Sequence, residues 1–289
     1  MSKRRFILNA DDFGMSDAFN QAVSEGFETG ILKSTSLVAN GEAFDSAVSN
    51  VIPKCAGLGV GVHLNIIEGK SLISNLNKLT DEDGNFNNSY DLLILKAYTD
   101  KEFLEQLEQE FRAQIEKIKS TGIKITHIDS HVHTHAIPPI FEIVCKLAKE
   151  YGIKQIRTQF EKPYLIPDTA VFLNVKFYVN LIKIALLDVF TLINRSKVQE
   201  YGLKTNDYLL GVGYTSMMNN LTVACGLSAL NSRTKITAEA LIHPCRYEDG
   251  TIDGHFTEFQ ITKSEKLKEK IESMGFEISN YSEEQCQGT

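Results

Sequence analysis

The stretch "DKEFLEQLEQEFRAQIEKIKSTGIKITHIDSHVHTH", residues 100–135, carries a helix pattern, a strand pattern and a row of polar side chains, in that order. Its first part repeats apolar residues at steps of three and four, which is the spacing of one helix face. Asp100 is placed to cap this helix and Gly122 follows its end, so we expect a helix over 100–121. The branched run at 123–129, "IKITHID", then predicts a strand. The apolar stripe consists of Phe103, Leu104, Leu107, Phe111, Ile115 and Ile118.

The same alternation of short branched runs and helical segments covers most of the chain. Strands separated by helices imply parallel βαβ units. Seven strands without an obvious linker predict an α/β fold, a TIM-like, barrel-shaped sheet in a single domain over residues 1–289. The other six predicted strands are "RFILN" (5–9), "STSLV" (34–38), "GVGVHL" (59–64), "IKQIR" (153–157), "YLLGV" (208–212) and "EALIH" (239–243).

Three segments interrupt this rhythm. Residues 65–99, with "TDEDGNFN", and residues 244–260, with "YEDGTIDGH", predict polar loops. Residues 170–193 predict a long, mostly buried helix, whose apolar surface belongs to the core or to a dimer interface. Four polar residues recur too often there for a membrane span of about 20 apolar residues; they are Lys176, Asn180, Lys183 and Asp188.

The composition is typical of a globular protein in water, with 43% hydrophobic and 23% charged residues. A formal net charge of −7 argues against nucleic-acid binding, which needs clustered lysine and arginine. Five scattered cysteines without a CxxC pair favour free thiols in a reducing compartment. The apolar run at the N-terminus is too short for a signal peptide. We therefore expect a cytoplasmic protein without nucleic-acid or membrane partners, and the apolar segment 170–193 leaves a homodimer open.

Side chains capable of chemistry fall at the carboxyl ends of five predicted strands. In parallel α/β sheets these strand ends build the active site, whatever its chemistry. The sixth predicted strand, which ends in "GVGY", contributes none. The residues that the other strands bring to this rim are Asp11, Asp12, His63, Asp129, His131, Arg157 and His243.

The segment 127–135, "HIDSHVHTH", places further ligand-type side chains beside them. Successive side chains of a strand point to opposite faces, so alternate residues point the same way. Up to five nitrogen or oxygen groups would therefore face one direction, as metal ligands, as supports for the ligands or as contacts to substrate. They are His127, Asp129, His131, His133 and His135.

Each of these residues also has a simpler explanation. Asp11 or Asp12 could cap a helix, His63 could be a satisfied core histidine, and His133 could line a loop. Asp129 is as well suited to orienting a histidine ring as to binding a metal. Their convergence favours a functional site, because two histidines and a carboxylate from separate strands form a facial metal set with positions open for water and substrate.

The adjacent carboxylates then have a chemical use. One aspartate of the pair would bind the metal, while its neighbour would take the proton of the attacking water. A departing amine or alkoxide needs a proton, a role that suits His243, and Arg157 could hold the base carboxylate. The pattern indicates metal-assisted hydrolysis of a carbonyl or related bond.

Four motifs resemble those of the YdjC-like carbohydrate deacetylase family: "NADDFGMS" at 9–16, "GVHLN" at 61–65, "THIDSHVHTH" at 126–135 and "HP" at 243–244. The resemblance runs through the chain in order. Characterised members fold as distorted (β/α) barrels and remove acetyl groups from N-acetylated sugars such as chitooligosaccharides. The resemblance therefore implies that fold and a small carbohydrate substrate.

By this resemblance, Asp12, His63 and His131 would bind one divalent metal ion, Asp11 would be the general base and His243 the acid. Magnesium or zinc is expected, because a carboxylate suits magnesium whereas two imidazoles favour a softer ion such as zinc. Cys245 stands where the family usually has a glycine after "HP".

Other functions remain open from the sequence. A metal-dependent phosphoesterase or cyclic amidase on the same barrel would need a glycine-rich phosphate-binding turn. The segment "GVGYTSMMNN" at 211–220 is a weak candidate, since no lysine or arginine cluster accompanies it. A non-heme iron oxygenase uses the same triad, usually on an all-β scaffold. A metal-binding scaffold protein would have a closed coordination shell without a spare acid or base.

Overall fold

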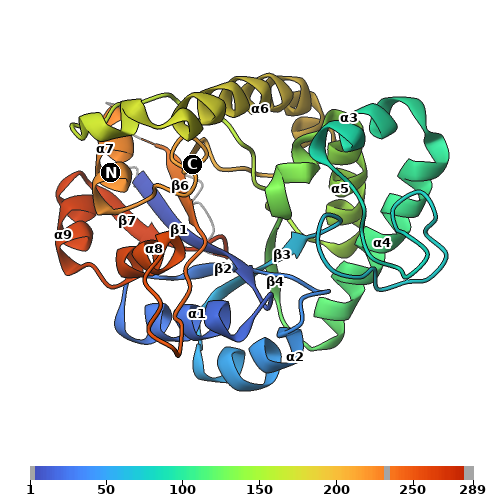
Figure 1. The fold of residues 1–289 in the computed structure, drawn as a ribbon, viewed down its shortest axis with the longest axis horizontal. Coiled ribbons are helices and arrows are strands. Elements are labelled where there is room, and N and C mark those ends of the chain that lie inside the picture. Colours follow the sequence, from blue (N-terminus) through green and yellow to red (C-terminus); the bar gives the residue numbers. More distant parts are fainter. Residues whose placement is uncertain (1–3, 231–234, 283–289) are drawn as a thin grey trace.

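The computed structural model describes residues 4–230 and 235–282, and it shows an α/β fold whose sheet is curled into a half-barrel (Figure 1). The strands follow the order β4-β3-β2-β1-β6-β5, and β7 also pairs with β1. All six strand pairings are parallel, which confirms the predicted sheet of about seven parallel strands. The strands are β1 (Arg4–Phe13), β2 (Ser34–Leu37), β3 (Gly59–Leu64), β4 (Ile125–Ser130), β5 (Tyr208–Leu210), β6 (Thr237–Ile242) and β7 (Phe276–Ser279).

Helices surround the curled sheet (Figure 1). They are α1 (Asp17–Thr29), α2 (Phe44–Ser46), α3 (Tyr90–Thr99), α4 (Lys101–Ser120), α5 (Pro138–Tyr151), α6 (Val175–Glu200), α7 (Asn220–Ala229), α8 (Gly254–Thr262) and α9 (Glu265–Ser273). Short helical turns occur at η1 (Ala47–Val51), η2 (Ile52–Lys54), η3 (His131–Ala136) and η4 (Thr169–Leu173).

The predicted helix over 100–121 is confirmed as α4. The Asp100 carboxylate accepts a hydrogen bond from the backbone N–H of Phe103, and Gly122 has a φ of +81°, which ends the helix in the left-handed region. The helix packs on β3 and α5, and most of its predicted stripe is fully buried. Each such side chain stabilises the fold by about 1.5–3 kcal/mol through its removal from water.

The predicted strand at 153–157 is wrong. Only two isolated bridges form there, Ile128 with Ile156 and Gln155 with Lys204. Side chains take the backbone groups that a longer ladder would use, since Asn206 accepts from the Thr158 N–H and His135 contacts the Arg157 carbonyl. The segment still crosses the open edge of the half-barrel beside β4.

The seventh strand comes from a segment that was not predicted, β7, which pairs with the first residues of β1. Its signal was present, because Gly275 follows α9 and the residues 276–279, "FEIS", alternate between apolar and polar. The two predicted loops are also only partly correct. Residues 65–99 end in α3, and residues 244–260 include the start of α8.

The predicted burial of the apolar helix is wrong. Helix α6 exists, but many of its large apolar side chains are exposed, and its polar side chains at Asn180, Thr191 and Asn194 are buried. By length and composition this helix could cross a membrane, so its polar residues argue less against a span than expected. In the structure, 39% of its most apolar window is buried against the rest of the protein.

The cysteines of the described residues carry free thiols. Cys55, Cys145 and Cys245 are buried and Cys225 is partly exposed, as expected for a chain without a disulfide framework. Cys286 lies outside the described residues.

Candidate metal and catalytic site

Two consecutive aspartates at the end of β1 reach one site because the strand is irregular there. In a regular strand Asp11 and Asp12 would point to opposite faces. The register of β1 against β2 shifts between Ala10 and Phe13, and Asp12 has a φ of 63°. A β-bulge re-aims side chains in this way. Both carboxylates therefore contact residues of the same polar rim.

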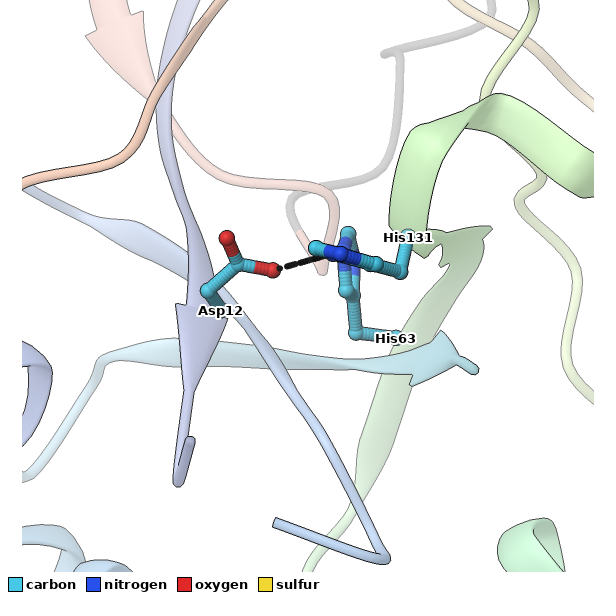
Figure 2. A group of neighbouring side chains, drawn as sticks. All are labelled: Asp12, His63 and His131. Atoms are coloured by element: carbon cyan, nitrogen blue, oxygen red, sulfur yellow. Dashed lines mark hydrogen bonds and ion pairs between the residues drawn. The ribbon is translucent and has the colours of Figure 1, made fainter. Parts of the chain in front are cut away.

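Figure 2 shows Asp12, His63 and His131 facing one another from β1, β3 and the turn η3 that follows β4. The Asp12 Oδ1 atom lies 2.8 Å from His131 Nδ1 and 3.2 Å from His63 Nε2. One ligand atom from each residue lies within 4.8 Å of the others. Burial opposes ionisation of Asp12, but hydrogen bonds from His131 and His63 outweigh it and hold the pKa well below its usual value. This group could hold a metal ion.

The His63 ring is oriented for ligation by its other nitrogen. Its Nδ1 lies 2.7 Å from Asp129 Oδ1, which fixes the Nδ1–H tautomer and directs the Nε2 lone pair toward Asp12. Burial disfavours a charged ring, yet Asp129 and Asp12 raise the pKa of His63 to about 10. An ion bound at Nε2 would therefore displace a proton. This carboxylate–histidine arrangement is typical of protein metal sites.

The Asp129 carboxylate is held by three donors. It accepts from His63, from the Ser36 hydroxyl at 2.6 Å and from the Arg157 guanidinium at 2.8 Å. Burial opposes its ionisation, but Arg157 and His63 outweigh that effect and lower its pKa. Asp129 also belongs to a second close group, with Asp11 and His63. Because Arg157 occupies both carboxylates of that group, Asp129 fits an orienting role better than ligation.

His127 lies beside Asp129, with its Nε2 3.8 Å from Asp129 Oδ2. Its Nε2 is 3.1 Å from the Ser36 hydroxyl, and its ring stacks on Tyr281 at 4.1 Å between centroids. Burial lowers the pKa of His127 to about 4, so the ring is neutral. A Cβ at Gly61 would lie 2.4 Å from this ring, which explains the glycine in β3. His127 therefore supports the site from within the core.

Asp11 is clamped by an arginine from the segment that runs beside β4, an edge strand of the sheet. The two Arg157 terminal nitrogens each donate at 2.7 Å to a different Asp11 oxygen, and Asn9 donates to Oδ1 at 2.7 Å. This is the bidentate geometry of strong arginine–carboxylate pairs. A carboxylate offers about four lone-pair positions, so three donors leave one free.

Arg157 is fully buried and also contacts Glu239, with Nε at 2.8 Å from Oε1. The Tyr281 hydroxyl donates to the same carboxylate. Burial raises the pKa of Glu239 to about 7, although Arg157 opposes the rise. Asp11, Asp129 and Glu239 together surround the guanidinium, so each carboxylate position depends on Arg157.

His243 directly follows β6 and contacts residues of α8. Its Nδ1 lies 3.4 Å from Glu258 Oε2, and its carbonyl contacts His255 Nδ1 at 2.8 Å. Burial disfavours the charged ring, but the Glu258 hydrogen bond and the charges of Glu258, Asp12 and Asp11 raise the pKa of His243 to about 9. His243 is therefore a protonated group at neutral pH. Cys245 beside it has no left-handed backbone, so the family's usual glycine is not needed there.

His133 and His135 have different surroundings. His135 is fully buried, with its ring nitrogens near the Ser130 hydroxyl and the Arg157 carbonyl, so it supports the loop. His133 has a left-handed φ of 58°, and its Nδ1 is buried without a hydrogen-bond partner. Such strain at a non-glycine residue is common at functional sites.

Several residues of this site were not predicted. Glu239 was detectable, because an acidic residue inside the apolar run "EALIH" needs a buried partner. Ser36 and Asn9 lie on strands next to predicted site residues, but single hydroxyls and amides carry little signal. Glu258 lies on α8, where a loop was expected, and Tyr281 follows the strand that was missed.

Comparisons with known proteins agree with these motifs. A family model described as "YdjC-like protein" matches residues 5–273. The carbohydrate deacetylase of Clostridium beijerinckii is 43% identical over 162 residues, 55% of this chain and 63% of that protein. The carbohydrate deacetylase of Brevibacillus brevis is 40% identical over 149 residues, 52% of this chain and 57% of that protein. The chain thus spans less than two thirds of the length of these curated relatives.

A solved structure shares the fold over nearly the whole length. The crystal structure from Enterococcus faecalis V583, described by a proposed role in cellobiose-phosphate cleavage, superposes with a TM-score of 0.74 and 22% identity. The match covers 97% of this chain and 98% of that one. At this identity the likeness supports the architecture alone.

Proposed function

The chain belongs to the YdjC-like protein family, and from this premise we propose that it is a metal-dependent carbohydrate deacetylase. It would hydrolyse the acetamide of N-acetylated sugars of the chitooligosaccharide type to acetate and a free amine. One observation carries the proposal: Asp12, His63 and His131 bring ligand atoms within 4.8 Å of one another, and His63 is equally close to Asp11, which Arg157 clamps. Curated relatives that match half of the chain are carbohydrate deacetylases.

The donor set fits one divalent ion, magnesium or zinc. Asp12, His63 and His131 would hold it, leaving the remaining positions for water and substrate. Such an ion polarises the acetyl carbonyl and acidifies water beside it. Asp129 would keep His63 in the required tautomer.

Asp11 would be the general base. Its remaining lone pair takes a proton from the water as that water adds to the acetyl carbon. Arg157 donates to both carboxylate oxygens, so the base is held in one position. His243 would donate a proton to the sugar nitrogen as the C–N bond breaks, and Glu258 keeps that proton in place.

A phosphoesterase or cyclic amidase receives less support from the geometry. The backbone N–H groups of the glycine-rich segment, at Gly211, Val212 and Gly213, donate to the buried Glu161 carboxylate. A phosphate would need these donors. The same segment therefore satisfies an internal acid.

Acetate release tests the proposal directly. The metal-stripped chain would be reloaded separately with magnesium, zinc, manganese or cobalt and incubated with N-acetylglucosamine monomers and oligomers. We expect acetate with at least one metal and one sugar. Protein that binds metal but releases no acetate from any sugar, while it hydrolyses a phosphate ester or a cyclic amide, would overturn the proposal.

Glu258→Gln is expected to move the alkaline limb of the pH–rate profile. The folded pKa of His243, about 9, exceeds the usual 6.5, so the proton donor is present at lower pH and is lost as pH rises through about 9. The same protonation stabilises the fold fully below about 6.5, and that contribution is also lost through about 9. Glutamine keeps the shape of the Glu258 side chain but removes its negative charge.

The limb in Glu258→Gln should shift down by roughly one pH unit or more, the effect of one adjacent charge. The measurement is kcat against pH for both proteins at saturating metal. A Glu248→Gln variant, on an exposed loop residue, is the matched control and should keep the wild-type limb. An unchanged limb in Glu258→Gln would show that His243 is not the titrating acid.

A further inference from the structure

The segment that follows β7 carries a tyrosine into the buried interior of the protein. Strand β7 runs parallel to β1 with Ser279 opposite Ile7, so the chain beyond it continues toward the Asp11 end of β1. The buried ring of Tyr281 stacks on His127 of β4, with 4.1 Å between centroids and 23° between planes. Strands β2 and β3 separate β1 from β4, so the ring reaches β4 across the concave side of the curled sheet.

Hydrogen bonds on both sides fix the backbone beside this tyrosine. Arg5 of β1 donates through Nε to the Ser279 hydroxyl at 3.0 Å. The Asn280 side chain donates to the Gly57 carbonyl at 3.1 Å, just before β3. A Cβ at Gly59 would lie 2.9 Å from the Asn280 side chain, so the segment packs directly on the start of β3. The position of the tyrosine is therefore set by two strands of the sheet.

The Tyr281 hydroxyl completes the surroundings of Glu239, a fully buried carboxylate of β6. Tyr281 donates to Oε2, whereas Arg157 donates to Oε1 from Nε at 2.8 Å and from Nη2 at 2.6 Å. Burial raises the pKa of the Tyr281 phenol well above its usual value, so the hydroxyl keeps its proton. A buried carboxylate stays charged only when its oxygens have donors. Tyr281 supplies the donor for Oε2.

Glu239 shares its arginine with two other carboxylates. Asp11 and Asp129 accept from Arg157 at 2.7–2.8 Å, so one buried positive charge faces three acids. Burial raises the pKa of Glu239 and the charge of Asp11 raises it further, while Arg157 and the Tyr281 hydrogen bond lower it, and the result is about 7. One hydrogen bond therefore decides how much of Glu239 is ionised near neutral pH.

We propose that Tyr281 is a positioning residue, whose hydroxyl keeps Glu239 ionised so that Glu239 holds Arg157 in the orientation that clamps Asp11. The guanidinium is planar, so the edge bound to Glu239 determines where the Nη atoms point. A neutral Glu239 binds that edge less tightly, since charge-assisted hydrogen bonds are roughly twice as strong as neutral ones. The inference rests on the proposed function, in which Asp11 is the general base.

An infrared pH titration of the full chain at saturating zinc tests the first step. The carboxylic-acid C=O band that is lost in Glu239→Gln reports protonation of Glu239. In Tyr281→Phe the midpoint of this band should rise by roughly one pH unit, the effect of one hydrogen bond to a charged group. Tyr214→Phe is the matched control, because the buried Tyr214 hydroxyl donates to the Tyr164 carbonyl at 2.9 Å, and it should keep the wild-type midpoint.

An unchanged midpoint in Tyr281→Phe would overturn the proposal. The titration needs no substrate, so its result does not depend on whether the chain releases acetate. A wild type without acetate release would count against the proposed function, whereas an unchanged midpoint counts against the link between Tyr281 and Glu239.

The pH dependence of kcat tests the second step. Near pH 7, Tyr281→Phe should lower kcat by roughly two- to fivefold, because a one-unit shift reduces the ionised fraction of Glu239 from about half to about a tenth. At pH 9 Glu239 is largely ionised in both proteins, so their kcat values should differ by less than about twofold.

A double-mutant cycle separates this role from packing against His127. Phenylalanine keeps the stacked ring, and in a Glu239→Gln background the change Tyr281→Phe should alter kcat by less than about twofold at either pH. Equal losses in the wild-type and Glu239→Gln backgrounds, or a loss that is the same at pH 7 and pH 9, would show that the tyrosine acts only by packing and would overturn the proposal.

Discussion

Replacing His131 by alanine is expected to abolish metal binding and, with it, acetate release. His131 supplies one of only three donors in the Asp12, His63 and His131 group, and its Nδ1 lies 2.8 Å from the Asp12 carboxylate. Loss of a residue that merely supports a metal ligand costs about 10–100-fold in affinity. Loss of a ligand should therefore cost more than roughly 100-fold. Calorimetric titration of zinc and magnesium into the stripped protein measures the affinity, and acetate release measures turnover.

The fold should survive this change, because the His131 side chain is 14% exposed and lies at the rim. Thermal unfolding provides the control. Metal at 100 times its dissociation constant stabilises the wild type by about 2.7 kcal/mol, whereas the melting temperature of His131→Ala should not respond to metal. Glu68→Gln is the matched variant, since Glu68 is 59% exposed and lies 3.6 Å from the far His131 nitrogen. The metal affinity of Glu68→Gln should fall by less than tenfold. Wild-type metal affinity in His131→Ala would remove this residue from the ligand set.

The location of the residues at strand ends was predictable, because it depends only on the order and direction of the strands. Parallel strands end at one edge of a sheet, so His63, Asp129 and His243 had to approach one another once their strands were recognised. Conformation at single residues was not predictable in this way. The positive φ of Asp12 follows from a bulge in β1, and nothing in "NADDFG" distinguishes that bulge from a helix cap.

Burial was predicted least well, and α6 shows why. A high mean hydropathy predicts that a helix is buried, but it does not predict which face of the helix packs against the protein. The loops at the rim expose backbone carbonyls and N–H groups that need partners. Asn180, Thr191 and Asn194 meet these groups, so three polar side chains of the helix are buried while several of its apolar ones are exposed. The position of these loops depends on the whole fold and is absent from local sequence patterns.

Asp11→Asn is expected to keep the metal and lose turnover. Asparagine has nearly the same shape, so it can still accept from Arg157 through its carbonyl oxygen, but it cannot take a proton from water. The variant leaves Arg157 paired with Asp129 and Glu239, so no unpaired charge is buried. Metal affinity should therefore stay within about tenfold, because Asp11 is not one of the three donors. Turnover should fall by roughly 10²–10⁴, the contribution of a positioned general base.

Glu239→Gln provides the matched comparison at the other end of the same guanidinium. Both variants are assayed above pH 7, where Glu239 is ionised. Glu239→Gln then removes a charge from Arg157 as Asp11→Asn does, and its oxygens contact Arg157 and Tyr281. Its turnover should fall by less than tenfold, even if its melting temperature changes. If Asp11→Asn and Glu239→Gln lose turnover equally, the role of Asp11 is to balance the charge of Arg157. If only Asp11→Asn loses turnover while it binds metal normally, Asp11 acts on the water itself, since the two variants disturb the guanidinium alike.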